Sequence, residues 1–167
     1  MDLFMAEENT QAAEMVNGLI KRSQHAQAIL STFTQEQVDK ICEAIAKAGK
    51  EHAQELAQAA VQETRRGVVA DKVTKNIFAS ECIWESLKDV KTVGVVSEDE
   101  DKGLVSIAEP MGVIAGVTPV TNPTSTVIFK SMIALKTRNT IVFGFHPQAQ
   151  KSCVMAGKLV EAAAEAA

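Results

Sequence analysis

The sequence predicts an α/β fold in which helices come first, a β-hairpin follows, and a parallel βαβα unit comes last. Three observations lead to this prediction. Up to about residue 90, apolar residues recur at helical spacing. Residues 91–108 contain two short apolar runs on either side of a charged turn that includes a glycine. From residue 109 onward, strand and helix patterns alternate, which is typical of a parallel sheet with right-handed crossovers.

The first ninety residues carry four predicted helices. The second begins at a capping box, in which the Thr34 hydroxyl and the Gln37 amide each satisfy a free main-chain N–H group. Gly67 is predicted to end the third helix, and Asp71 to cap the fourth. The apolar residues that define the four helices are Ala12, Met15, Val16, Leu19 and Ile20; Val38, Ile41, Cys42 and Ile45; Ala53, Leu56, Ala57, Ala60 and Val61; and Val73, Ile77, Trp84 and Leu87.

A β-hairpin is predicted next, and the two strands of a parallel pair follow it. The hairpin strands are residues 91–97 and 104–108, and the charged segment 98–103 forms the turn between them. The parallel strands are residues 112–117 and 140–145. Two parallel strands alone neither bury both faces nor close their edges, so we expect further strands from a longer polypeptide or from a partner. We also expect the chain to be cut off within a helix, because its alanine-rich end carries no stop signal.

The most informative part of the chain is one strand-to-helix junction. Val113, Ile114 and Val117 form the short apolar run of a strand that is covered on both faces. Asn122 is a favoured N-cap residue and Pro123 a favoured first residue of a helix, which is predicted to run to about residue 136. Such a junction directs main-chain N–H groups and the positive end of a helix at one point. It therefore predicts a site for an anion or a cofactor.

Composition excludes several classes of function. With 167 residues the chain is about one ordinary domain, and its net charge of −4 gives no electrostatic case for nucleic acid or an anionic membrane. It has no apolar run long enough to span a bilayer, and its acidic first residues argue against a signal peptide. Cys42, Cys82 and Cys153 lie far apart within helical patterns, which predicts reduced core thiols in a cytoplasmic protein. No paired spacing of Cys or His indicates a metal site.

Long stretches of the sequence are similar to one known family. The motifs are residues 109–126 (EPMGVIAGVTPVTNPTST), 128–131 (IFKS), 135–143 (LKTRNTIVF) and 145–147 (FHP). They resemble the N-terminal half-domain of the aldehyde dehydrogenase superfamily. Residues 33–39, 71–80 and 91–97 more closely resemble the CoA-acylating acetaldehyde dehydrogenase module of bifunctional aldehyde-alcohol dehydrogenases.

The resemblance implies a fold and a reaction. The fold is the Rossmann-like parallel-sheet half of an aldehyde dehydrogenase, as an incomplete domain: residues 1–90 form its helical part, 91–108 a hairpin that serves as an oligomerisation arm, and 109–167 the start of the NAD-binding unit. The implied enzyme is a homo-oligomer that interconverts acetaldehyde and acetyl-CoA with NAD(H), with CoA as co-substrate. A cysteine thiolate attacks the aldehyde in this chemistry. The family's nucleophile lies beyond residue 167, and none of the three cysteines occupies its motif.

The resemblance also implies the residues of the site. The segment after the first parallel strand lines the nicotinamide end of NAD, with the Thr118 and Thr121 hydroxyls in contact with it, and a His-Pro corner after the second strand receives the adenosine ribose. Asn122 lies close to the asparagine that donates to the oxyanion in general aldehyde dehydrogenases, although a gap-free comparison puts Thr121 in that column. The cofactor-binding residues are thus Val117, Thr118, Pro119, Val120, Thr121, Asn122, His146 and Pro147.

Other readings of the same residues remain open. General aldehyde dehydrogenases carry Lys-Pro at the ribose corner, and the His146-Pro147 pair of this chain favours NAD over NADP. Asn122 and Pro123 also suit an ordinary helix start. His25 and His52 are expected to face solvent. The chain as a whole is alternatively a non-catalytic assembly module of the same fold, or part of an enzyme that oxidises a semialdehyde without CoA.

Overall fold

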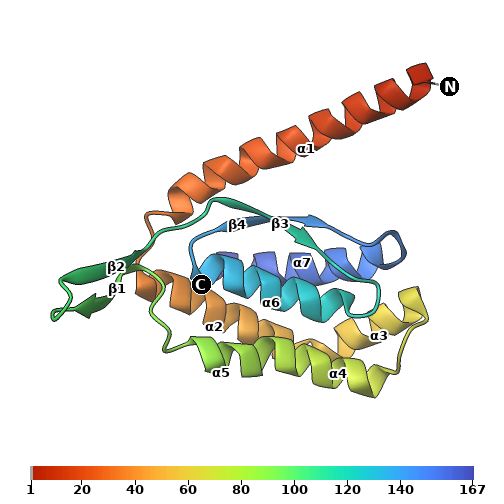
Figure 1. Cartoon of the computed structure of the whole chain (residues 1–167). Helices are drawn as coiled ribbons and strands as arrows, with labels where there is room; N and C mark the ends of the chain where they lie inside the picture. Colours follow the sequence, from red (N-terminus) through yellow and green to blue (C-terminus); the bar gives the residue numbers. More distant parts are fainter. Residues whose placement is uncertain (1) are drawn as a thin grey trace.

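The computed structural model describes the backbone of residues 2–167 and the side chains of residues 10–167, and it confirms the predicted order of helices, hairpin and βαβα unit. In Figure 1 the strands β3 and β4 lie between the long helix α1 on one side and the helices α6 and α7 on the other, and α2 to α5 form a further layer. The elements are α1 (Asp2–Leu30), α2 (Gln35–Glu51), α3 (Ala53–Thr64), α4 (Val69–Ile77), the π-helical segment η1 (Phe78–Cys82), α5 (Ile83–Leu87), β1 (Gly94–Asp99), β2 (Leu104–Ala108), β3 (Val113–Val117), α6 (Pro123–Lys136), β4 (Thr140–Gly144), the 3₁₀ turn η2 (Pro147–Ala149) and α7 (Gln150–Glu165).

The four strands form two separate sheets. β1 and β2 pair antiparallel as the predicted hairpin, and β3 and β4 pair parallel in a register that aligns Val113 with Thr140 and Val117 with Gly144. The sequence predicted that β3 is covered on both faces, and this is wrong for the described part of the chain. Gly116 is buried, but Val117 is 71% exposed. No third described strand pairs with β3 or β4, so the outer edges of both strands stay unpaired within the described residues.

The hydrophobic core lies among α2, α6 and α7. Helix α6 is buried over most of its circumference because α2, η1, α7 and β4 all pack against it. Helix α2 lies close to η1, since a Cβ atom added at Gly49 of α2 would lie 2.8 Å from the Cβ atom of Ser80 in η1. The core residues that are fully buried include Cys42, Leu56, Val127, Ile128, Met132, Cys153 and Ala156.

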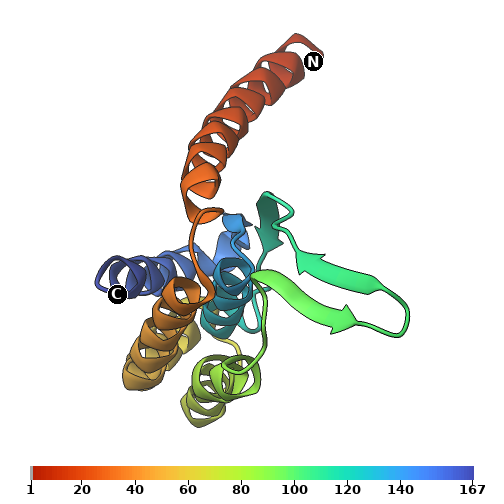
Figure 2. The same ribbon diagram turned by 90° about the vertical axis from the view of Figure 1, so that its left-hand side faces the viewer.

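Helix α1 departs from the amphipathic helix that the sequence predicted. It projects away from the rest of the molecule (Figure 2), and Met15 and Val16 of its apolar stripe are 64% and 44% exposed. The later part of the helix lies against β3 and β4, where the Thr140 hydroxyl donates to the Ser23 carbonyl oxygen over 3.1 Å. The stripe therefore has no partner along much of its length within the described residues.

The ends of α2 and α3 test two local predictions. The capping box at the start of α2 is confirmed, because Thr34 and Gln37 each bind the other's main-chain N–H group. The predicted stop at Gly67 is wrong. Helix α3 ends at Thr64, and Arg65 adopts the left-handed conformation that usually favours glycine, with φ at 53°.

Further predictions were wrong in the region from α4 to β1. Asp71 lies in the first turn of α4, and the N-cap is Val68, whose side chain makes no capping hydrogen bond. Cys82 is exposed on η1 and is not a core thiol. Strand β1 begins at Gly94, because residues 91–93 are held by the Gln35 side chain, whose oxygen accepts from the Thr92 and Val93 N–H groups.

Candidate functional site

The parallel strands place two bends at one edge of the molecule. The segment 118–122 follows β3 and the segment 145–147 follows β4, and parallel strands have their carboxyl ends at the same edge. The Thr118 N–H group donates to the Gly144 carbonyl oxygen over 3.1 Å, which ties the two strand ends together. In open α/β sheets this edge is where ligands bind.

The N-terminus of α6 lies at this edge. Asn122 is the N-cap residue and Pro123 the first helical residue, as predicted, but the Asn122 side chain makes no capping hydrogen bond. Its Oδ1 atom instead accepts from Lys75 Nζ over 3.1 Å, and its Nδ2 group donates to Thr121 Oγ1 over 3.4 Å. Among the side chains that the structure describes, none caps the first turn of α6, and the positive end of the helix faces the bend.

Three lysines bind the bend, and none of them was predicted from the sequence. Lys130 Nζ donates to the Val117 carbonyl oxygen and Lys72 Nζ to the Thr121 carbonyl oxygen, each over 2.7 Å, while Lys75 binds the Asn122 side chain. Lys72 is 5% exposed, and burial together with the charge of Lys75 lowers its pKa. Among the described residues, none of the three forms an ion pair with a carboxylate. The bend is therefore surrounded by positive charge, which suits an anionic ligand.

A buried asparagine holds the lysine-bearing helix in place. Asn76 is 1% exposed, and its Nδ2 group donates to the Ala53 carbonyl oxygen over 3.0 Å. The Thr124 hydroxyl, in the first turn of α6, donates to Asn76 Oδ1 over 2.9 Å. Lys72 and Asn76 lie four residues apart, so this polar face of α4 rests directly on the start of α6. In the sequence, the four-residue spacing of Lys72 and Asn76 was the signal that could have predicted this polar face of α4.

An apolar hollow of about 600 Å³ adjoins the bend between η1, α5 and α6. Asn122 and Lys75 lie at its border, next to the aromatic rings of Phe78 and Phe129. Phe78 is 61% exposed, so the hollow opens to solvent. Its lining residues are Thr74, Lys75, Phe78, Ala79, Ile83, Asn122, Ser125, Thr126 and Phe129. An amide donor thus stands beside a space that suits an aliphatic group.

The thiols do not reach this site. Burial raises the pKa of the Cys42 thiol to about 12, although the charge of Lys136 opposes the shift. Burial also raises the pKa of Cys153, whose sulfur lies 3.5 Å from Thr118 Oγ1. The Thr118 hydroxyl, which was predicted to contact the nicotinamide, is therefore directed into the core, and the residue as a whole is 2% exposed. Cys82 is exposed but does not line the hollow.

The second bend has its own local order. His146 precedes η2, and its Nδ1 atom accepts from the Gln148 N–H group over 3.2 Å, while Pro147 is exposed.

His25 and His52 are exposed, as predicted. No group of three His, Cys, Asp or Glu side chains among the described residues is arranged to hold a metal ion. Within the same residues, no helix has the length and apolarity needed to cross a bilayer.

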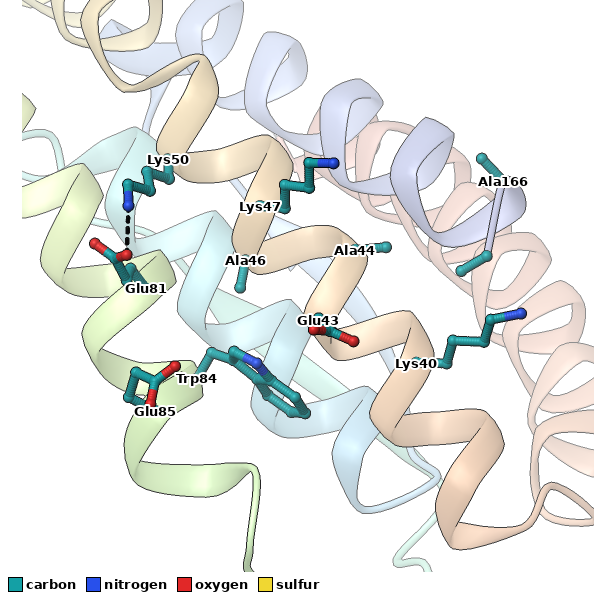
Figure 3. A pocket seen from close by; sticks show the side chains of 11 residues that line it. Lys40, Glu43, Ala44, Ala46, Lys47, Lys50, Glu81, Trp84, Glu85 and Ala166 are labelled. Atoms are coloured by element: carbon teal, nitrogen blue, oxygen red, sulfur yellow. Dashed lines mark hydrogen bonds and ion pairs between the residues drawn. The ribbon is translucent and has the colours of Figure 1, made fainter.

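A hollow of about 580 Å³ lies elsewhere, between α2, η1, α5 and the last residues (Figure 3). Lys40, Lys47 and Lys50 lie along α2 at its border, and Lys50 pairs with Glu81 across it. Trp84 lies beside it on α5. It shares no residue with the bend, and its lysines do not converge on one point. We therefore take the bend and its apolar hollow as the candidate site.

Comparisons with known proteins agree with the motifs. The model of the aldehyde dehydrogenase family matches residues 4–167. The bifunctional aldehyde-alcohol dehydrogenase of Escherichia coli K12 is 52% identical over 158 residues, which cover 95% of this chain and 18% of that protein. The succinate-semialdehyde dehydrogenase (acetylating) of Clostridium kluyveri is 43% identical over 136 residues, or 81% of this chain and 30% of its own length.

A solved structure has the same fold. The acetylating aldehyde dehydrogenase from Geobacillus thermoglucosidasius superposes with a TM-score of 0.90 at 46% identity, and the match covers 94% of this chain and 35% of that one. The chain thus spans about a third of this structure and less than a fifth of the Escherichia coli relative.

Proposed function

This chain belongs to the aldehyde dehydrogenase family, and we propose that it forms part of a CoA-acylating acetaldehyde dehydrogenase. The reaction joins acetaldehyde, CoA and NAD to give acetyl-CoA, NADH and a proton. The observation that supports it most is the bend 118–122, which leads into the uncapped N-terminus of α6, and along which Lys130 binds the preceding Val117 carbonyl, Lys72 the Thr121 carbonyl and Lys75 the Asn122 side chain.

The bend is proposed to hold the nicotinamide end of NAD, and His146-Pro147 the adenosine ribose. Main-chain groups of Val117, Thr118, Pro119 and Val120 and the Thr121 hydroxyl are the proposed contacts. The uncapped helix end and the lysines are proposed to attract the pyrophosphate, which is the anionic part of the dinucleotide and joins its nicotinamide and adenosine ends. Bound NAD supplies the hydride acceptor. The chain's own residues fix the position of that acceptor at the open edge of the sheet.

Asn122 is the proposed donor to the oxygen of the aldehyde. Lys75 binds Oδ1 and one N–H of Nδ2 donates to Thr121, so the second N–H of Nδ2 is the part of the amide that remains to donate. A positioned amide donor stabilises the oxyanion that forms when a thiolate adds to the carbonyl carbon. Cys42, Cys82 and Cys153 do not supply this thiolate, because two are buried with raised pKa values and the third lies outside the hollow.

The hollow beside Asn122 is proposed to receive the carbon chain of the aldehyde. Its aromatic and aliphatic lining favours a short uncharged chain over a charged one. The names of relatives support the acyl transfer to CoA, since the Geobacillus structure and the Clostridium kluyveri enzyme are both described as acetylating.

The hairpin is proposed to be an arm between subunits. Val105 and Ile107 share one face of β2 and are 58% and 60% exposed, and Leu104 on the other face is 59% exposed. A homo-oligomer would cover these apolar side chains.

The enzyme that carries this chain tests the proposal through NADH formation from acetaldehyde and NAD, with and without CoA. We expect formation to require CoA and acetyl-CoA to accumulate. Asn122→Ala should lower kcat roughly 100-fold to 1000-fold, as loss of one oxyanion donor does. Asn17→Ala, on the exposed face of α1, is the matched control and should change nothing. NADH formation that is equally fast without CoA, or that survives Asn122→Ala, would refute the proposal.

A further inference from the structure

A third hollow lies beside the second bend and has a different character. It measures about 460 Å³ and lies between the end of α3 and the start of α7. Three cationic side chains border it, those of Arg65, Arg66 and Lys151, with a single carboxylate, that of Glu63. Pro147 and Gln148 complete the side next to His146. The hollow is thus a basic recess next to the proposed ribose corner.

The one carboxylate in the recess is already engaged. Glu63 accepts hydrogen bonds from the Lys151 N–H group over 2.8 Å and the Ser152 N–H group over 2.7 Å, so it caps α7 from a different helix. Burial acts to raise the pKa of Glu63, but these hydrogen bonds and the charge of Lys151 outweigh it and hold the pKa below its usual value. Glu63 therefore stays ionised, and it closes the N-terminus of α7 to any other anion.

The turn that ends α3 places both arginines at the border of the recess. Arg65 has a φ of 53°, which costs energy for any residue with a side chain, and the Arg66 N–H group donates to Thr64 Oγ1 over 3.3 Å. Both arginines are exposed, and within the described part of the chain neither forms an ion pair. With Lys151 and Glu63 included, the recess carries two net positive charges.

We propose that Arg65, Arg66 and Lys151 bind a phosphomonoester on the ribose whose adenosine lies against His146-Pro147. This rests on the proposed function, which places adenosine there. The net charge of the recess balances the charge of about −1.5 to −2 on a phosphomonoester. Guanidinium groups bind such phosphates in a bidentate manner. Two phosphates have this chemistry: the 3′-phosphate of CoA, which the proposed reaction uses, and the 2′-phosphate of NADP, which would take the place of NAD.

Two matched pairs of ligands test the proposal, because the members of each pair differ by one ribose phosphate. The first pair is CoA and dephospho-CoA, and the second is NADP and NAD. The binding of each ligand to the 167-residue chain is followed through the amide NMR signals of residues 145–152. We expect at least one phosphorylated ligand to bind about tenfold more tightly than its partner. The pair that shows the difference identifies the source of the phosphate.

Three variants complete the test. Arg66→Gln and Arg65→Gly should each abolish most of the difference within the pair and leave the affinity for the unphosphorylated member unchanged. Arg65→Gly is expected to stay folded, because glycine favours this conformation. Arg22→Gln, exposed on α1, is the control. Equal binding within both pairs would overturn this inference alone. Failure of all four ligands to shift signals at residues 145–152 would overturn the proposed adenosine site as well.

Discussion

The buried ammonium group of Lys72 donates a hydrogen bond to the Thr121 carbonyl oxygen across 2.7 Å. This contact joins α4 to the bend that follows β3, although the hairpin separates the two in the sequence. The bend has no regular secondary structure of its own. Its shape therefore depends on donors from neighbouring helices, with Lys72 and Lys130 on its carbonyl groups and Lys75 on the Asn122 side chain.

Replacing Lys72 by methionine should destabilise the chain. The substitution leaves the Thr121 carbonyl without its donor, which costs about 1–3 kcal/mol in the free energy of unfolding. Urea denaturation followed by circular dichroism measures the change. Lys75→Met is the control, since Lys75 is exposed and its loss should cost less than about 1 kcal/mol. If both substitutions lowered the free energy of unfolding equally, the buried hydrogen bond of Lys72 would contribute no more to stability than the exposed one of Lys75.

Replacing Glu63 by glutamine should weaken the start of α7 and change the pH dependence of stability. Loss of the cap on Lys151 and Ser152 should cost about 0.5–2 kcal/mol. The pKa of Glu63 is lower in the folded chain than its ordinary value of 4.5. Its contribution is therefore fully present above pH 4.5 and is lost as the pH falls through the folded pKa.

Thermal unfolding, measured at a series of pH values from neutral to acid, monitors the contribution of ionised Glu63 to stability. The wild-type chain should lose its advantage over Glu63→Gln as the pH falls below the ordinary pKa of glutamate. Glu161→Gln, at an exposed position of α7, should run parallel to the wild type. A difference between Glu63→Gln and the wild type that stays constant down to the lowest pH would contradict the ionised cap.

Lys136 and Asp39 should show strong coupling. Lys136 is 1% exposed, forms an ion pair with Asp39 and lies 5.6 Å from the centre of the Trp84 ring. Lys136→Met removes one partner of a largely buried pair, which costs about 3–5 kcal/mol. The double variant with Asp39→Leu should recover much of that loss. A double-mutant cycle on unfolding free energies measures the coupling. If the loss in the double variant equalled the sum of the losses in the two single variants, the ion pair would not contribute to stability.

Two glycine substitutions should have opposite effects. A Cβ atom at Gly49 would meet Ser80 Cβ at 2.8 Å and Ile128 Cγ2 at 3.3 Å, so Gly49→Ala should cost about 1–3 kcal/mol. A Cβ atom at Gly157, in the interior of α7, meets nothing within 4 Å. Gly157→Ala should therefore stabilise the chain by about 1 kcal/mol, because alanine favours a helix. Chemical denaturation of both variants checks the pair, and destabilisation of both would contradict the packing of α2.

Local signals made much of the fold predictable. The bounds of α6 and β2 agree with the prediction because Asn122-Pro123 marks a helix start and Gly103 precedes a short alternating strand. Capping at Thr34 needs only residues within one turn. The exposure of Val117 was not predicted, because the apolar run 113–117 is typical of a strand covered on both faces, and no further strand pairs with β3 among the described residues.

Contacts between distant residues could not be predicted in this way. Lys75 binds Asn122 across 47 residues, and Glu63 binds Ser152 across 89. Each of these side chains sits in a helical pattern that also suits an ordinary solvated face. The left-handed Arg65 was missed because Gly67, two residues later, carries the stronger local signal for a helix end. The residues of the bend were located from the sequence, and the lysines that shape it were found in the structure.

Titration of the 167-residue chain with NADH, followed through its main-chain amide NMR signals, tests the central claim most directly. We expect the largest shifts at Val117, Thr118 and residues 120–122, with a second set at residues 145–148, and we expect Lys72→Met to reduce the first set. Shifts confined to other parts of the chain, or none at saturating NADH, would contradict the placement of the nicotinamide nucleotide at the bend.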